Sequence, residues 1–112
     1  MASITAQIKR GSAELAVLTL LAEHPLHGYE LAKQIEAQTR GVLRFDMASL
    51  YPMLHRLERK SWVSAEWRTL PNGRRRRCYR LTATGRKQIA PLRAQWRAFF
   101  QALQSVTRFQ NA

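Results

Sequence analysis

The sequence predicts a mainly α fold with one small β-hairpin, an α+β domain that ends in a long helix. Apolar residues recur at helical spacing in four segments, and residues 63–81 alternate between polar and apolar around an Asn-Gly pair. The charge is also concentrated. Residues 55–87 hold eleven Lys and Arg against two Glu, which is +9 of the net +12. A basic segment of this kind indicates a polyanionic partner.

Composition limits the classes of protein that remain. A chain of 112 residues with 46% hydrophobic residues is long and apolar enough for one folded domain, which excludes a disordered polycation. Its single cysteine allows neither an intramolecular disulfide nor a cysteine-rich zinc site. No segment resembles a signal peptide or a membrane span, so we expect a cytoplasmic protein without a cofactor.

The first half of the predicted domain contains two helices. Residues 1–11 are interpreted as an N-terminal arm, and Ser12 is a candidate N-cap for a largely buried helix over residues 13–23. Pro25 ends that helix, because the residue before a proline avoids the helical region. A short amphipathic helix is then predicted from Gly28 to about residue 37.

A third helix is predicted to follow Asp46 as its N-cap. Its apolar stripe has the spacing i, i+3, i+4, i+7 and consists of Leu50, Met53, Leu54 and Leu57. Pro52 lies more than a turn inside, where it either bends the helix or marks a later start near Ser49.

A two-stranded ribbon follows the third helix. Residues 63–69 alternate as a half-buried strand does, and residues 74–81 form the return strand. Between them, Asn72 and Gly73 predict a type I′ turn, because both tolerate a positive φ. Thr82 is the predicted cap of the last helix.

The last helix, predicted over residues 83–106, has an apolar seam. Its members are three or four residues apart, with Phe100 beside them: Ile89, Leu92, Trp96, Phe99, Leu103 and Val106. This alternation is typical of helices that pair with another helix. A single small domain has little use for such a surface, so the seam predicts a homodimer that also uses other surface, such as the arm and first helix.

Three helices followed by a basic ribbon are the parts of a winged helix-turn-helix. In that arrangement the third helix enters the major groove of duplex DNA, and the ribbon turn reaches the neighbouring backbone or minor groove. The predicted organisation is an arm (residues 1–11), a DNA-binding domain (residues 12–82), and a dimerisation helix with its tail (residues 83–112).

The predicted DNA contacts lie on the outward face of the third helix and on the ribbon turn. They are Ala48, Ser49, Tyr51, Pro52, His55, Arg59, Arg74, Arg75, Arg76 and Arg77. Such side chains supply donors for phosphates and base edges. The arginines could instead be a solvated charged edge, and Tyr51 could pack in the core. We favour DNA contact for both.

Three segments of the sequence resemble the PadR family of bacterial transcriptional regulators. They read PLHGYEL at residues 25–31, SLYPMLHRLE at 49–58 and YRLTATGR at 79–86. The resemblance implies a homodimer that binds an operator, usually as a repressor. Ala48 and Ser61 stand where the family often has glycine, and Cys78 stands where it often has an aromatic residue.

Other classes of protein fit the sequence less well. Asp46 is the only aspartate, and we find neither a converging set of carboxylates and histidine nor a glycine-rich phosphate loop, so no catalytic site is predicted. Membrane binding is disfavoured because the charge lies on the ribbon rather than along a helix. A regulator that acts through protein contacts, with only non-specific DNA binding, is the alternative.

The remaining candidate sites are less specific. His24 and His27 have metal-compatible spacing, but Pro25 interrupts them, so we predict no metal site. Cys78 is either redox-sensitive or a buried small hydrophobe, and we favour burial. A small aromatic effector would find stacking surface and cations at Arg93, Trp96, Phe99 and Phe100. We slightly favour the alternative, a repressor without a ligand.

Overall fold

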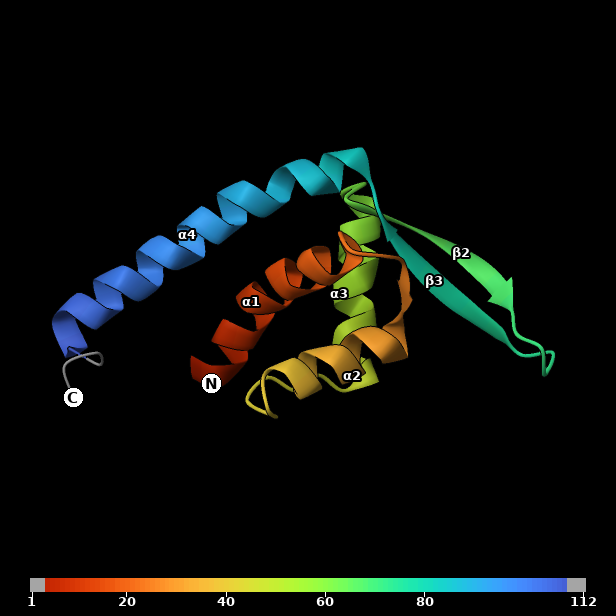
Figure 1. The fold of residues 1–112 in the computed structure, drawn as a ribbon, viewed down its shortest axis with the longest axis horizontal. Helices are drawn as coiled ribbons and strands as arrows, with labels where there is room; N and C mark the ends of the chain where they lie inside the picture. The colour runs from red at the N-terminus through yellow and green to blue at the C-terminus, as the bar shows by residue number, and fades with distance from the viewer. Residues whose placement is uncertain (1–3, 109–112) are drawn as a thin grey trace.

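The fold is the predicted α+β arrangement, a winged helix-turn-helix followed by a long helix (Figure 1). The computed structural model describes residues 4–108, so residues 1–3 of the predicted arm and 109–112 of the predicted tail lie outside it. In chain order the elements are α1 (Ile4–Leu21), β1 (Leu26–His27), α2 (Gly28–Gln38), α3 (Met47–Arg59), β2 (Val63–Thr69), β3 (Arg75–Leu81) and α4 (Ala83–Thr107).

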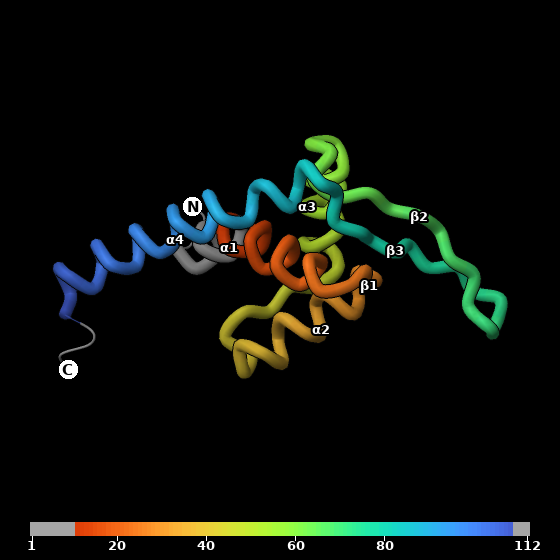
Figure 2. The backbone as a smooth tube through the Cα atoms, turned by 45° about the horizontal axis from the view of Figure 1, so that its top comes forward, coloured from red at the N-terminus to blue at the C-terminus, as the bar shows by residue number. Residues whose placement is uncertain are grey.

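The molecule is elongated because two elements project from opposite ends of a compact centre. Its principal extents are 53 × 28 × 27 Å. The β2–β3 hairpin extends at one end, and α4 runs alongside α1 and continues past it at the other (Figures 1 and 2). A projecting hairpin and a projecting helix each leave surface for a partner.

Helices α1, α2 and α3 enclose the core beneath the sheet. The predicted stripe of α3 is buried, and Leu50, Leu54 and Leu57 are fully excluded from solvent together with Leu18 of α1 and Leu31 of α2. Fully burying a leucine contributes about 1.5–3 kcal/mol. This core fixes α3 by one face and leaves the opposite face free.

The first helix begins earlier than predicted. It starts at Ile4 rather than after Ser12, so the backbone of residues 4–11 belongs to α1 and Ser12 is not its N-cap. The prediction gave one capping residue more weight than the good helix formers before it, such as Gln7 and Lys9. Gly11 also allows a close approach, since a Cβ there would lie 2.9 Å from Cζ2 of Trp96 on α4.

The sheet has three strands rather than the predicted two. The short strand β1 pairs antiparallel with β3, with Leu26 opposite Tyr79 and His27 opposite Cys78, so β3 is the central strand. Two residues are too few to show an alternating pattern in the sequence. The His27 N–H also donates to Glu30 Oε1 at 2.9 Å, which anchors the start of α2 to the sheet.

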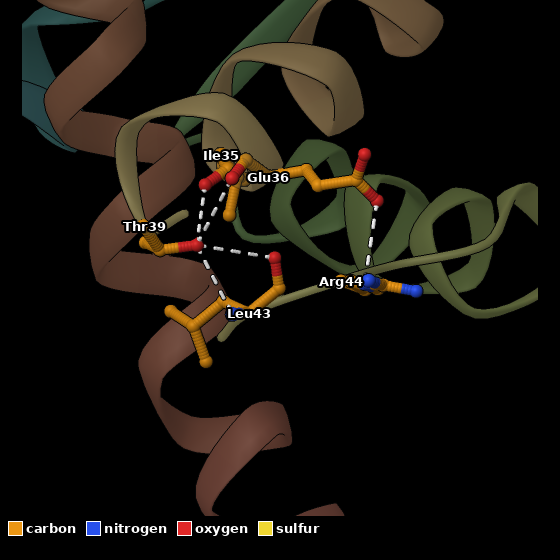
Figure 3. Close-up of polar contacts among 5 residues, drawn as sticks. All are labelled: Ile35, Glu36, Thr39, Leu43 and Arg44. Carbon is orange, nitrogen blue, oxygen red and sulfur yellow. Dashed lines mark hydrogen bonds and ion pairs between the residues drawn. The ribbon is translucent and has the colours of Figure 1, made fainter. Parts of the chain in front are cut away.

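The turn between α2 and α3 is held by one side chain (Figure 3). The Thr39 hydroxyl donates to the Ile35 carbonyl at 2.7 Å and accepts the Leu43 N–H at 3.0 Å. Glu36 and Arg44 pair across the same turn, with Oε1 and Nε 3.7 Å apart. Gly41 lies in the same turn and has a φ of +80°, a backbone conformation that favours glycine. These contacts set the angle at which α3 follows α2.

Asp46 caps α3 as predicted, because its Oδ1 accepts the Ser49 N–H at 2.8 Å. The helix begins at Met47 and continues through Pro52, so a later start near Ser49 is wrong. Proline removes one helical hydrogen bond, but here it lies on the exposed face, where water can satisfy the freed carbonyl. After the helix, Ser61 has a φ of +63°, a backbone conformation that favours glycine.

The hairpin turn is not the predicted type I′. Gly73 has a φ of +84°, but Asn72 is not among the described residues with positive φ, as type I′ would require. The Gly73 N–H donates to the Leu70 carbonyl at 2.9 Å, and the Leu70 N–H donates to the Arg74 carbonyl at 2.7 Å. These bonds define a three-residue loop: a type I turn with Pro71 at its favoured position, followed by glycine.

The start of α4 is hydrogen-bonded to the connection between α3 and β2. Thr82 is its N-cap, as predicted, and its Oγ1 accepts the Gly85 N–H at 3.0 Å. The same hydroxyl lies 2.9 Å from the Trp62 carbonyl oxygen, to which it can donate. A Cβ at Gly85 would overlap the Trp62 carbonyl group, so only glycine allows this approach.

Candidate nucleic-acid interface

One face of α3 carries all the helix residues predicted to contact DNA, and every one of them is exposed. They are Ala48, Ser49, Tyr51, Pro52, His55 and Arg59. Tyr51 retains 46% of its accessible surface, so it is not the core residue that the alternative interpretation required. This face offers hydroxyl, imidazole and guanidinium groups to solvent beside one another.

The four consecutive arginines divide into two groups. Arg74, Arg75 and Arg76 are exposed at the turn and the adjoining end of β3. Arg77 is half-buried, and its Nη2 donates to Oε2 of Glu58 at 2.7 Å. The Glu58 carboxylate raises the pKa of Arg77 above its ordinary value. The turn therefore presents three exposed cations, while the fourth is paired with α3.

The opposite face of the hairpin is partly neutralised. Glu66 lies between two arginines, with its Oε1 at 3.0 Å from Nη2 of Arg68 and 3.8 Å from Nη2 of Arg80. Glu66 and Arg68 have an exposed position on β2, so these pairs contribute little stability. Neither pair involves Arg74, Arg75 or Arg76, so the positive charge of the hairpin turn is not offset by Glu66.

Trp67 is a surface aromatic that the sequence interpretation placed on the half-buried face of its strand. The side chain is 55% exposed, and residues 66–69 at this end of β2 are all exposed. Guanidinium carbons of Arg75 and Arg77 lie 5.2 and 5.6 Å from the centre of its ring. Such distances are within the range of cation–π attraction. Trp67 lies directly opposite Arg77 in the hairpin. Pairing the two predicted strands residue by residue could therefore have placed Trp67 beside arginine.

A hollow of about 360 Å³ lies where α2, α3 and the hairpin meet. Its lining combines aromatic and cationic side chains with the start of α2: His27, Gly28, Tyr29, Tyr51, Trp67, Arg75, Arg76 and Arg77. Gly28 allows the elements to approach, since a Cβ there would lie 3.2 Å from Cε1 of Tyr51. Backbone N–H groups at a helix start and arginine side chains both favour an anion. The hollow connects the α3 face with the hairpin.

The seam of α4 is only partly covered by its own chain. Ile89 and Leu92 pack against the core, whereas the far half of the helix is exposed at Phe99, Phe100, Leu103 and Val106. Trp96 lies between the two halves, with ring centres 5.8 Å from Phe99 and 5.6 Å from Phe100. The exposed half is a continuous apolar surface on a projecting helix.

A second hollow, of about 340 Å³, lies between α1 and α4. It is lined by Leu15, Arg93, Trp96, Arg97, Phe100, Gln101 and Gln104. Three of the four predicted effector residues, Arg93, Trp96 and Phe100, are therefore brought together. Phe99 contacts Trp96 but is not part of this lining.

Other chemistry finds little support among the described residues. Within residues 4–108, no group of three His, Cys, Asp or Glu side chains lies close enough to hold a metal ion. Cys78 is buried, as favoured from the sequence. None of the helices in this part of the chain combines the length and apolar character that a bilayer-spanning helix needs.

Comparison with protein families gives a match over most of the chain. The model of the "Transcriptional regulator PadR-like family" matches residues 17–91. The transcriptional regulator Rv3488 of Mycobacterium tuberculosis is 35% identical over 83 residues, which cover 74% of each chain. An uncharacterised protein of Lysinibacillus sphaericus is 29% identical over 93 residues, 83% of this chain and 85% of the relative.

Solved structures show the same fold. A transcriptional regulator from Clostridium thermocellum has a TM-score of 0.81 at 25% identity, covering 88% of this chain and 96% of its own. A PadR family transcriptional regulator from Eggerthella lenta has a TM-score of 0.78 at 26% identity, covering 93% of this chain and 88% of its own. The winged arrangement and the long last helix thus recur in proteins described as transcriptional regulators.

Proposed function

Since the chain belongs to the PadR-like family of transcriptional regulators, we propose that it binds a specific duplex DNA operator as a homodimer and represses transcription there. The observation that carries the proposal is the exposed face of α3, on which all six predicted contact residues are exposed and whose Tyr51 lines one hollow with Arg75 and Arg76 of the hairpin. An exposed helix face and a neighbouring basic turn together match a major groove and the phosphates that border it. The lack of opposing charge at the turn supports the same assignment.

Each part of this surface has a distinct role in the proposal. Base edges are contacted by Ser49, Tyr51, His55 and Arg59. The guanidinium of Arg59 can donate two parallel hydrogen bonds to guanine. Ala48 and Pro52 add apolar contact, for example with thymine methyl groups. Arg74, Arg75 and Arg76 bind phosphate and fix the position of the protein on the duplex.

The homodimer is proposed from α4. The exposed half of the seam lies on a helix that projects beyond the rest of the chain, and a twofold partner would cover it with an identical surface. Two copies would then present two α3 helices to two half-sites of one operator. Each half-site would be contacted in the same way, so the operator should contain an inverted repeat.

Replacement of base-contacting residues tests the proposal. Tyr51→Ala and Arg59→Ala should each weaken operator binding by about 5- to 150-fold, corresponding to roughly 1–3 kcal/mol, with little change on random duplex DNA. Lys87→Ala is the matched control for Arg59→Ala, because it removes one exposed positive charge from α4 instead of from α3. Equal losses on operator and random DNA would favour a regulator that works through protein contacts.

The hollow between α1 and α4 favours a second, regulatory proposal: a small flat aromatic ligand binds beside Trp96 and Phe100 and lowers operator affinity. Arg93 and Arg97 would form ion pairs with an anionic substituent on such a ligand. A tenfold loss of operator affinity needs about 1.4 kcal/mol of preference for the DNA-incompetent dimer. Aromatic compounds should quench the fluorescence of the wild type more than that of Trp96→Phe. Quenching that leaves operator affinity unchanged would refute the ligand switch.

A further inference from the structure

Arg77 differs from the three arginines that precede it. Its side chain is 33% exposed, and the Glu58 side chain that receives its hydrogen bond is 21% exposed. The two residues are 19 positions apart in the sequence, one near the end of α3 and the other on the central strand β3. Their 2.7 Å contact therefore joins the helix that faces DNA directly to the hairpin.

The guanidinium of Arg77 is held from two sides. Its carbon lies 5.6 Å from the ring centre of Trp67, the residue directly opposite it on β2. The Glu58 hydrogen bond raises the pKa of the group, which means that it favours the charged form of Arg77. An arginine whose charge is paired with a carboxylate through one of its N–H groups has less to offer a phosphate than an unpaired one.

The part of the hairpin between this pair and the turn moves whenever the hairpin tilts at the pair. Gly73 at the turn precedes Arg77 by four residues, which corresponds to about 13 Å along the strand at 3.3 Å per residue. A tilt of about 10° at the pair would therefore move the turn by about 2 Å, enough to misplace its hydrogen bonds to phosphate. The angle between α3 and the hairpin must be fixed if both are to engage the same duplex.

We infer that Arg77 and Glu58 form a positioning pair that fixes the hairpin relative to α3, and that Arg77 does not bind phosphate. The inference rests on the proposed function, because it assigns roles within the same DNA-binding surface. It also refines the sequence prediction, in which all four arginines contact DNA. Trp67 completes the arrangement as the surface on which the Arg77 guanidinium lies.

The salt dependence of binding separates a phosphate ligand from a positioning residue. Each phosphate contact contributes about 0.9 to the slope of log K against log salt. Arg76→Ala should therefore reduce the slope by about 0.9 per protomer, whereas Arg77→Ala should leave the slope unchanged and lower operator affinity about fivefold. Both substitutions remove one positive charge, so each is the control for the other.

Glu58→Gln should change operator affinity in opposite directions, depending on whether Arg77 binds phosphate or positions the hairpin. The substitution removes a negative charge, so Arg77 acting as a phosphate ligand would be released and operator binding would tighten. A positioning role predicts that operator affinity falls about fivefold while affinity for random DNA does not fall. The charge-swapped variant with both Glu58→Arg and Arg77→Glu should recover operator affinity relative to either single substitution.

The outcomes also separate this inference from the proposed function. All variants are compared at a temperature where circular dichroism shows that they are folded. If the wild type does not prefer an operator over random DNA, the proposed function fails. If it does, but Arg77→Ala flattens the slope as Arg76→Ala does, the inference alone is overturned. Variants that lose only thermal stability, with both affinities unchanged, overturn it as well.

Discussion

Replacing Phe99 with aspartate should dissociate the proposed homodimer. Phe99 is 49% exposed in the single chain, so about half of the 150–250 Å² that an aromatic residue buries, on the order of 100 Å², remains for a partner to cover. At about 25 cal/mol per Å² this is roughly 2.5 kcal/mol per protomer, or about 5 kcal/mol per symmetric dimer. Phe99→Ala should therefore weaken dimerisation by as much as about 4 × 10³-fold, and aspartate, which adds a buried charge, by more.

Sedimentation velocity over a range of protein concentrations measures this effect. Phe99→Asp should sediment as a folded monomer and bind the operator poorly. Ala94→Asp is the matched control, because Ala94 is exposed on the side of α4 away from the seam, and this variant should remain a dimer. A dimer that survives Phe99→Asp with unchanged affinity would refute the reasoning and move the interface to another surface.

Three further experiments test the local structure. Gly85→Ala should lower the free energy of unfolding by about 1–3 kcal/mol in a denaturant titration, because its Cβ would overlap the Trp62 carbonyl; unchanged stability would contradict the close approach of α4. Asp46→Ala should destabilise by about 1 kcal/mol through the lost cap on Ser49, while Asp46→Asn should not; equal stability of the two variants would argue against capping. Cys78 should react with a thiol reagent only after unfolding, as it is buried, and rapid alkylation of the native protein would contradict its position.

Periodicity made most of the fold predictable. The stripe Leu50, Met53, Leu54 and Leu57 is buried as predicted, and the face left over is the exposed face of α3. Capping residues also carried local information, since Asp46 and Thr82 each accept the N–H that their positions predict. These signals depend on residues a few positions apart, so the sequence contains them directly.

The features that were missed depend partly on contacts between distant segments and partly on local alternatives that the sequence leaves open. Strand β1 exists because its two residues lie against β3, and the start of α1 depends on helix continuity rather than on Ser12. The pairing of Arg77 with Glu58 is not visible in a run of four identical residues. The hairpin turn was mispredicted because Asn72-Gly73 fits two kinds of loop, and Pro71 decides between them.

The most direct test of the central claim is selection of bound sequences from random duplex DNA by the wild-type protein. We expect enrichment of an inverted repeat whose two halves are spaced by about one helical turn, 10–10.5 base pairs, or a multiple of it. The enriched sequence should also outcompete random DNA by about 10³-fold or more at physiological salt. Recovery of sequences that bind no better than random DNA would contradict the claim that this chain binds a specific operator.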